Sequence, residues 1–205
     1  MRKFSQACEN NKGPILEVLQ RYLSQDEVSA SKQATILEIG SGTGQHAVFF
    51  SQHLPWLQWQ TADLAQSFDS INAWRDEAGS VNCLAPLELD LRESSWLSYR
   101  ADNIFTANTL HIVSAELVAR LINGAAAILD DGGYLFVYGP FSYNGRFTSN
   151  SNARFNEWLQ QRDPDSAIRD FETVNGLAQK AGLRLVEDNA MPANNRLLVF
   201  RMQAG

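Results

Sequence analysis

The fold is decided by one stretch of sequence, Ile36-Leu37-Glu38-Ile39-Gly40-Ser41-Gly42-Thr43-Gly44-Gln45-His46. Apolar residues over 35–39 predict a buried β-strand, and three glycines at alternating positions end it abruptly. Residues 45–54 then have the pattern of a helix that stops before Pro55. Glycines accept positive φ and let a ligand approach the main chain closely, so this strand-turn-helix passage presents backbone N–H groups to a ligand.

Two classes of ligand use such a turn, the dinucleotides and S-adenosylmethionine. The dinucleotide fingerprint Gly-x-Gly-x-x-Gly/Ala requires a small residue at position 45, where this chain has Gln45. An acid two residues before the first glycine can accept hydrogen bonds from the loop or from the ammonium group of S-adenosylmethionine. We therefore predict that the cofactor is S-adenosylmethionine and that its site includes Glu38, Gly40, Ser41, Gly42 and Gly44. A turn without any ligand is the alternative.

Two further acids follow predicted strands. Asp63 comes after a strand at 56–62, and Asp90 comes after a strand at 82–89. Ligands of open α/β sheets bind at the carboxyl ends of strands, where Asp63 can accept from both ribose hydroxyls. That feature also fits NAD. Asp90 can accept from the adenine amino group, and Leu91 offers an apolar side for the adenine ring. The predicted cofactor site also includes Leu64.

Strand and helix patterns alternate along the rest of the chain. The expected helices cover 14–23, 64–78, 114–129, 153–162 and 170–181, and the remaining strands cover 103–107, 134–138, 183–189 and 196–202. Helices between strands indicate a parallel sheet, and two adjacent strands at the end indicate an antiparallel edge. We predict an α/β three-layer sandwich with a mostly parallel seven-stranded sheet and an antiparallel C-terminal edge. It forms a single domain over 1–205, with an N-terminal helical segment of about residues 1–30.

Composition narrows the function classes. The formal net charge is −6 and no dense run of Lys or Arg occurs, which argues against a nucleic-acid partner. No apolar run is long enough to span a membrane, and the N-terminus lacks the apolar core of a signal peptide, so we expect a cytoplasmic protein with no membrane partner. The spacing of Cys8 and Cys83 fits no metal motif, and we expect free thiols and no bound metal. The oligomeric state is left open.

The glycine turn together with Asp63 and Asp90 resembles the class I S-adenosylmethionine-dependent methyltransferases, whose Rossmann-like fold the resemblance implies. More specifically, the chain is similar to the methyltransferase-like protein 26 family, whose resemblance implies a cofactor and no defined substrate. The motifs that carry this likeness are Asn11-Lys12-x-Pro14-Ile15-Leu16, Gly40 to His46, Ala107-Asn108-x-x-His111-Ile112, Tyr138-Gly139-Pro140-Phe141 with Asn144-Gly145, Ile168-Arg169-Asp170-Phe171-Glu172, and Met191-Pro192-Ala193-Asn194-Asn195.

Asn108 and His111 follow the strand at 103–107, so we expect both near the methyl donor. Asn108 is assigned to the cofactor site. A histidine at such a place in small-molecule O-methyltransferases often removes a proton from a hydroxyl, which an imidazole can do near neutral pH. His111 is therefore the candidate catalytic base, and a helix cap or a packing role is the alternative. The expected acceptor is a small polar molecule.

The polar stretch 139–152 is interpreted either as a surface loop or as a lid that brings Tyr143, Asn144 or Arg146 to the acceptor. Arg169 and Asp170 are expected to form a structural ion pair.

Three functions remain open on the sequence. The first is methyl transfer from S-adenosylmethionine. The second is a methyltransferase-fold module that binds the cofactor without transfer. The third is an NAD-dependent oxidoreductase, which Gln45 and the absence of a Tyr-x-x-x-Lys pair disfavour.

Overall fold

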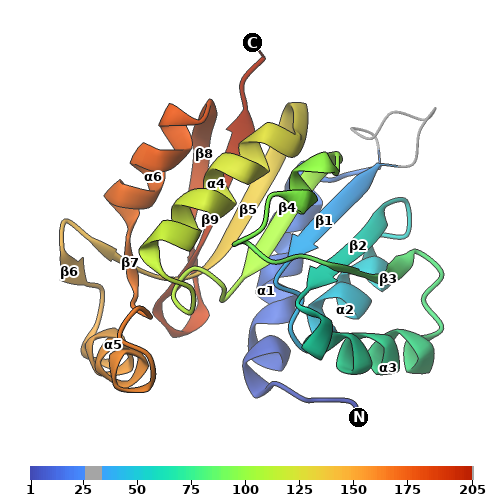
Figure 1. Cartoon of the computed structure of the whole chain (residues 1–205), viewed down its shortest axis with the longest axis horizontal. Coiled ribbons are helices and arrows are strands. Elements are labelled where there is room, and N and C mark those ends of the chain that lie inside the picture. The colour runs from blue at the N-terminus through green and yellow to red at the C-terminus, as the bar shows by residue number, and fades with distance from the viewer. Residues whose placement is uncertain (26–33, 205) are drawn as a thin grey trace. The chain divides into compact units, whose positions relative to one another are not determined.

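The computed structural model describes residues 1–25 and 34–204, drawn as a ribbon in Figure 1. The chain divides into two compact units. The first consists of Met1–Asp90 and Ala101–Phe105, and the second consists of Leu91–Arg100 and the chain from Thr106 onward. Each unit is described by itself below, and the single-domain organisation expected from the sequence stays a prediction. Most of the predicted connection before the first strand, residues 26–33, lies outside the described residues.

The first unit contains four parallel strands in the order β3-β2-β1-β4. The strand before the glycine turn, β1 (Thr35–Ile39), pairs with β2 (Gln58–Asp63) on one side and with β4 (Ala101–Ala107) on the other. Strand β3 (Cys83–Glu88) pairs with the outer side of β2. Parallel strands must be joined by crossovers, which here carry α2 (Gln45–His53) and α3 (Phe68–Ala78). The predicted parallel sheet is confirmed in this unit.

The N-terminal helix is longer than the sequence pattern indicated. We expected it to begin near Pro14, but α1 covers Gln6–Tyr22 and contains Pro14 in its interior. Ser5 is the N-cap residue, because its hydroxyl oxygen accepts from the N–H of Cys8 at 3.4 Å. The prediction relied on the preference of proline for the first turn and missed this cap.

An aromatic core lies inside the first unit. The rings of Phe50, Trp59 and Phe105 meet pairwise with centroids 5.2–5.8 Å apart, at tilted or edge-to-face angles that aromatic quadrupoles favour. All three side chains are completely buried. They come from α2, β2 and β4, so the core ties the helix after the glycine turn to two strands of the sheet.

The second unit contains the end of β4 and the antiparallel edge, in the order β4-β5-β9-β8. Strand β5 (Leu129–Tyr143) pairs antiparallel with β9 (Asn195–Met202), which pairs antiparallel with β8 (Leu183–Met191). Helices α4 (Ala115–Ile128) and α6 (Phe171–Lys180) lie side by side over these strands (Figure 1). The predicted mostly parallel sheet with an antiparallel C-terminal edge is therefore confirmed.

Strand β5 is much longer than the predicted strand 134–138. The strand continues beyond residue 138 because neighbouring strands pair with it. Gly139 and Pro140 pair with β9, and Phe141 and Ser142 pair with β7 (Arg169–Asp170). A short hairpin then returns through β6 (Arg146–Phe147) to α5 (Asn150–Arg162). The stretch 139–152 is thus mainly strand and hairpin, and the interpretation as a simple surface loop was wrong.

Three short 3-10 helices complete the described elements, namely η1 (Ala65–Ser67), η2 (Ser95–Ser98) and η3 (Pro192–Asn194). Cys8 and Cys83 are free thiols, as expected. Within residues 1–25 and 34–204, no helix has the length and apolar character that a membrane crossing requires.

The glycine turn generates the first prediction. A Cβ on Gly44 would lie 2.8 Å from the Cα of Ile71, and the residue has a φ of +90°. Gly44→Ala should therefore lower the free energy of unfolding by about 1–3 kcal/mol or more, through strain and collision with backbone. Gly13 is the matched control because it lies within α1 with open space around it, so Gly13→Ala should raise stability by about 0.5–1 kcal/mol. Urea denaturation measures both, and equal effects of the two changes would contradict the proposed strain.

Candidate cofactor and acceptor sites

The glycine loop, residues 40–44, is fastened to the end of β2. The N–H groups of Gly40 and Ser41 both donate to the carbonyl oxygen of Ala62, at 2.9 and 3.1 Å. The hydroxyl of Ser41 closes the connection in both directions, since it accepts from the N–H of Ala62 and donates to the carbonyl oxygen of Glu38, each at 3.1 Å. Gly40, Gly42 and Gly44 all have positive φ, between 55° and 90°. The loop is thus held in one conformation, and a side chain at any of the three glycine positions would be strained in it.

Asp63 lies directly against this loop. Its carboxylate accepts from the N–H of Gly42 at 2.6 Å and from the N–H of Leu64 at 2.7 Å. Its carbonyl oxygen accepts from the N–H of Leu89 at 3.0 Å, which fixes the chain one residue before Asp90. The structure therefore brings Asp63, Leu64 and the glycine loop together and places Asp90 just beyond the end of β3.

Glu38 is the buried acid beneath the loop, with 1 % of its surface exposed. The indole N–H of Trp59 donates to one of its carboxylate oxygens at 2.9 Å. Burial penalises the charged form and raises the pKa of Glu38 to about 8, against the smaller opposing effect of hydrogen bonds from Trp59 and Ser41. At neutral pH this carboxyl group is mainly protonated, and a positive charge brought next to it would ionise it.

His46 and Asn11 form a buried polar pair near the start of α2. The Nε2–H of His46 donates to the amide oxygen of Asn11 at 2.6 Å, and the imidazole stacks on Phe50 with centroids 5.3 Å apart. Burial lowers the pKa of His46 to about 4, so the ring is neutral at pH 7. His46 packs in the core of the first unit, whereas His53, on the same helix, is exposed.

One sequence signal points to this pair, namely a polar residue on an otherwise apolar helix face. Asn11 lies four residues before Ile15 on the apolar face of α1, and both side chains are buried. A polar residue within the buried face of a helix indicates a specific partner, because an unpaired amide would be costly there. Gln45 was missed in a similar way, since it was considered only as a departure from the dinucleotide fingerprint.

In the second unit, Asn108 directly follows β4 and has a φ of +59°. Its N–H donates to the carbonyl oxygen of Tyr138 at 2.9 Å, which fixes this turn to β5. A left-handed residue other than glycine carries strain, and such strain gathers at functional sites. Asparagine tolerates this conformation better than most residues.

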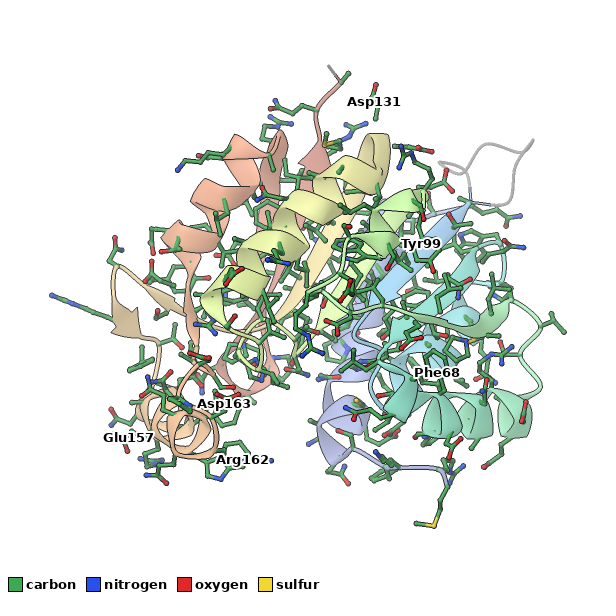
Figure 2. The ribbon with its side chains drawn as sticks, viewed as in Figure 1. Phe68, Tyr99, Asp131, Glu157, Arg162 and Asp163 are labelled. Carbon is green, nitrogen blue, oxygen red and sulfur yellow. The ribbon has the colours of Figure 1, made fainter. Side chains whose placement is uncertain are left out.

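His111 is also fixed within the second unit, with 6 % of its surface exposed. Its ring contacts Phe155 of α5 edge-to-face at 5.5 Å, and a Cβ on Gly139 would lie 3.6 Å from its Nδ1. Burial, assisted by the positive charge of Arg169, lowers the pKa of His111 to about 4. Figure 2 shows the charged side chains of Glu157 and Arg162 on α5, both exposed, so this helix turns Phe155 towards the histidine and charges towards solvent.

Arg169 holds the segment that carries His111, and the expected ion pair with Asp170 was wrong. The guanidinium group donates to the backbone carbonyl oxygens of Leu110, at 3.0 Å, and of Val113. The carboxylate of Asp170 instead accepts from Ser142 Oγ at 3.2 Å and from the N–H of Gly145 at 2.9 Å. Arg169 and Asp170 therefore each bind backbone groups. If the two side chains paired with each other, those backbone groups would lose their partners.

The hairpin residues proposed for a lid have structural partners. The Tyr143 hydroxyl donates to Asp188 at 2.7 Å, and the N–H of Asn144 donates to Glu172 at 2.9 Å. Arg146 is exposed and pairs with Tyr143 across the hairpin. The contacts fix Tyr143 and the turn residue Asn144, and a lid role stays a prediction for the three residues.

The predicted site residues thus fall into two groups. The first unit gathers Glu38, Gly40, Ser41, Gly42, Gly44, Asp63, Leu64 and Asp90, and the second contains Leu91, Asn108 and His111. The roles assigned to these residues stay predictions.

Several solved methyltransferase structures have the same fold as this chain. An O-methyltransferase family protein from Burkholderia thailandensis has a TM-score of 0.77 and 18 % identity over 95 % of this chain and 59 % of its own. An O-methyltransferase family 2 protein from Planctomyces limnophilus, in complex with apigenin, has a TM-score of 0.81 and 19 % identity over 95 % of this chain and 57 % of its own. Human N-acetylserotonin methyltransferase, in complex with S-adenosylmethionine, has a TM-score of 0.69 and 15 % identity over 97 % of this chain and 58 % of its own.

These likenesses show the fold of the class I methyltransferases, as the sequence predicted. This chain spans less than three-fifths of the length of each of the three proteins. A family of proteins matches nearly the whole sequence, over residues 2–202. The chain belongs to this family, which is described as protein of unknown function (DUF938).

Proposed function

We propose that this protein is an S-adenosylmethionine-dependent methyltransferase that acts on a small polar acceptor. The observation that carries the proposal is the glycine loop fastened to Asp63, with the buried acid Glu38 beneath it. The likeness to methyltransferase structures supports it, and so do the motifs that resemble methyltransferase-like protein 26. The neighbour in complex with apigenin supports a small-molecule acceptor.

The residues of the first unit fit the chemical groups of this cofactor. Glu38 offers an acceptor for the ammonium group of an amino acid, and Asp63 offers an acceptor for ribose hydroxyls. Asp90 and Leu64 would then hold the adenine. When bound, S-adenosylmethionine supplies a methyl group activated by a sulfonium, so the protein needs mainly to align the acceptor and exclude water.

The decisive experiment is transfer itself. Incubation with methyl-labelled S-adenosylmethionine and fractionated metabolite extracts should yield a labelled small molecule. Calorimetry should give saturable binding of S-adenosylhomocysteine, the demethylated product, and none of NAD. Binding of NAD alone would overturn the cofactor, and cofactor binding without any labelled product would favour a binding module instead.

Asp63 tests the ribose assignment. Asp63→Asn keeps one acceptor oxygen and removes the charge, so the affinity for S-adenosylhomocysteine should fall about 10–100-fold, because one charge-assisted hydrogen bond contributes about 1.5–3 kcal/mol. Asp69→Asn, at an exposed position in the first turn of α3, is the matched control and should leave affinity unchanged. A lower melting temperature with unchanged affinity would mean that Asp63 only caps the loop.

Glu38 tests the ammonium assignment through its proton. With a pKa of about 8, the free protein holds this proton at pH 7, and a neighbouring ammonium group should expel it. Cofactor binding at pH 7 should therefore release about one proton, measured by calorimetry in buffers of different ionisation enthalpy. Glu38→Gln, which retains an acceptor for Trp59, should abolish the release. Equal proton release by both proteins would place the ammonium group elsewhere.

His111 tests the general base. A base must be unprotonated, and burial keeps His111 neutral down to pH about 4. With S-adenosylmethionine saturating, so that the Glu38 proton has already been expelled, kcat/KM for the acceptor should stay constant from pH 8 to about 5 and fall as pH passes through about 4. His111→Phe keeps a ring beside Phe155 but has no nitrogen, and turnover should fall about 10²–10⁴-fold with cofactor affinity nearly intact. His53→Phe, at an exposed position, is the control. Full turnover by His111→Phe would show that proximity alone carries the reaction.

A further inference from the structure

The side chain of Gln45 is buried, with 3 % of its surface exposed. Its amide group uses all of its hydrogen-bonding positions, two as acceptor and two as donor. Its oxygen accepts from the N–H of Ser5 at 2.5 Å and from the hydroxyl of Thr43 at 3.2 Å. Its nitrogen donates to the carbonyl oxygen of Ser5 at 3.3 Å and to the carboxylate of Glu9 at 3.0 Å. One side chain at the first residue of α2 therefore joins the glycine loop to the beginning of α1.

The segment that Gln45 binds is named here the N-terminal clasp, residues Lys3–Lys12. Within it, Lys12 pairs with Glu9 at 2.5 Å, and the same ammonium group lies 4.8 Å from the ring centre of Phe49 on α2. This pairing lowers the pKa of Glu9, so the carboxylate stays charged as the acceptor for Gln45. The clasp thus binds Gln45 through the backbone of Ser5 and the side chain of Glu9.

A second connection joins the clasp to Thr43 of the glycine loop, through Ser70 of α3. The N–H of Lys3 donates to Ser70 Oγ, and Ser70 Oγ donates to the carbonyl oxygen of Thr43, both at 2.9 Å. The indole of Trp74 donates to the carbonyl oxygen of Lys3 at 2.8 Å. Thr43 is therefore held through its carbonyl by Ser70 and through its hydroxyl by Gln45.

Thr43 stands between Gly42, whose N–H donates to Asp63, and Gly44, whose N–H donates to the carbonyl oxygen of Ser41. Holding Thr43 therefore helps to keep the loop in the conformation in which Gly42 meets Asp63. A loop that is ordered before binding loses less entropy when a ligand arrives, which strengthens binding.

We propose that Gln45 is a positioning residue of the cofactor site, which couples the N-terminal clasp to the glycine loop. Cofactor binding tightens the clasp, and release of the clasp weakens cofactor binding by the same factor, because coupling between two equilibria is reciprocal. The coupling rests on the proposed function, since S-adenosylhomocysteine is its ligand.

Three variants of the full chain test the coupling. Gln45→Glu removes both donors and sets a carboxylate against Glu9. The Glu9→Gln, Gln45→Glu double variant exchanges the two groups, so that an amide again donates to a carboxylate. Gln52→Glu makes the same change at an exposed position of α2 and is the matched control.

Two measurements are made on each protein. Trypsin cleavage after Lys3 and Lys12, followed by intact mass, reports release of the clasp with and without S-adenosylhomocysteine. Calorimetry reports the affinity for the same ligand. For Gln45→Glu we expect cleavage about tenfold faster, affinity about tenfold weaker and loss of the protection that the ligand gives the wild type. The double variant should recover most of each effect, and Gln52→Glu should match the wild type.

Several results would overturn the coupling. Cleavage of Gln45→Glu at the wild-type rate would show that Gln45 does not hold the clasp. Faster cleavage with unchanged affinity would show that the clasp and the loop are independent. Failure of the double variant to recover either property would reduce Gln45 to a general stabilising role. A wild type that does not bind S-adenosylhomocysteine overturns the proposed function, and it is recognised separately because the ligand-free cleavage rates still compare the variants.

Discussion

The carbonyl oxygen of Ala62 accepts two hydrogen bonds from the glycine loop, and the rest of the candidate cofactor site depends on this contact. The loop can take its left-handed conformations only while its first N–H groups have a partner, and that partner belongs to a different strand. Strand β2 must therefore pair with β1 before the loop is shaped. Asp63, the next residue of β2, then meets Gly42, and the site follows from strand register.

Beneath the loop, polar groups are buried inside an aromatic core, and each has a partner. Glu38 is bound by Trp59, whose ring packs on Phe50 and Phe105. Full burial of an ionised carboxylate costs several kcal/mol, which explains why this acid keeps its proton at neutral pH. A buried, protonated carboxyl group contributes little to the stability of the fold. It can lose its proton when a cation binds next to it.

Much of the fold could be predicted from the sequence because its signals are local. The glycines and the apolar run before them predict a strand, a turn and a helix, and the two final strands appear with the expected antiparallel pairing. The start of α1 was missed at a local signal, the Ser5 cap, whereas the other errors arose where a distant partner decides the outcome. Strand β5 continues past residue 138 because β9 and β7 offer it partners, and Arg169 serves backbone carbonyls 56–59 residues away. The position of Asn11 on the buried face of α1 indicates that it has a partner, but the identity of the partners of Asn11 and Gln45 could not be read from local pattern, because those partners belong to another helix.

The order of the strands also has a consequence for how the chain folds during synthesis. The strand that completes the first unit, β4, is made last among its members, since Ile36 of β1 pairs with Asn103, 67 residues further along the chain. An emerging polypeptide that ends at Asp90 would expose one whole edge of β1 and would lack Phe105 from the aromatic core. Such edges invite wrong pairing with other chains. The ribosome must therefore deliver residues well beyond the end of β3 before the glycine loop rests on a finished sheet.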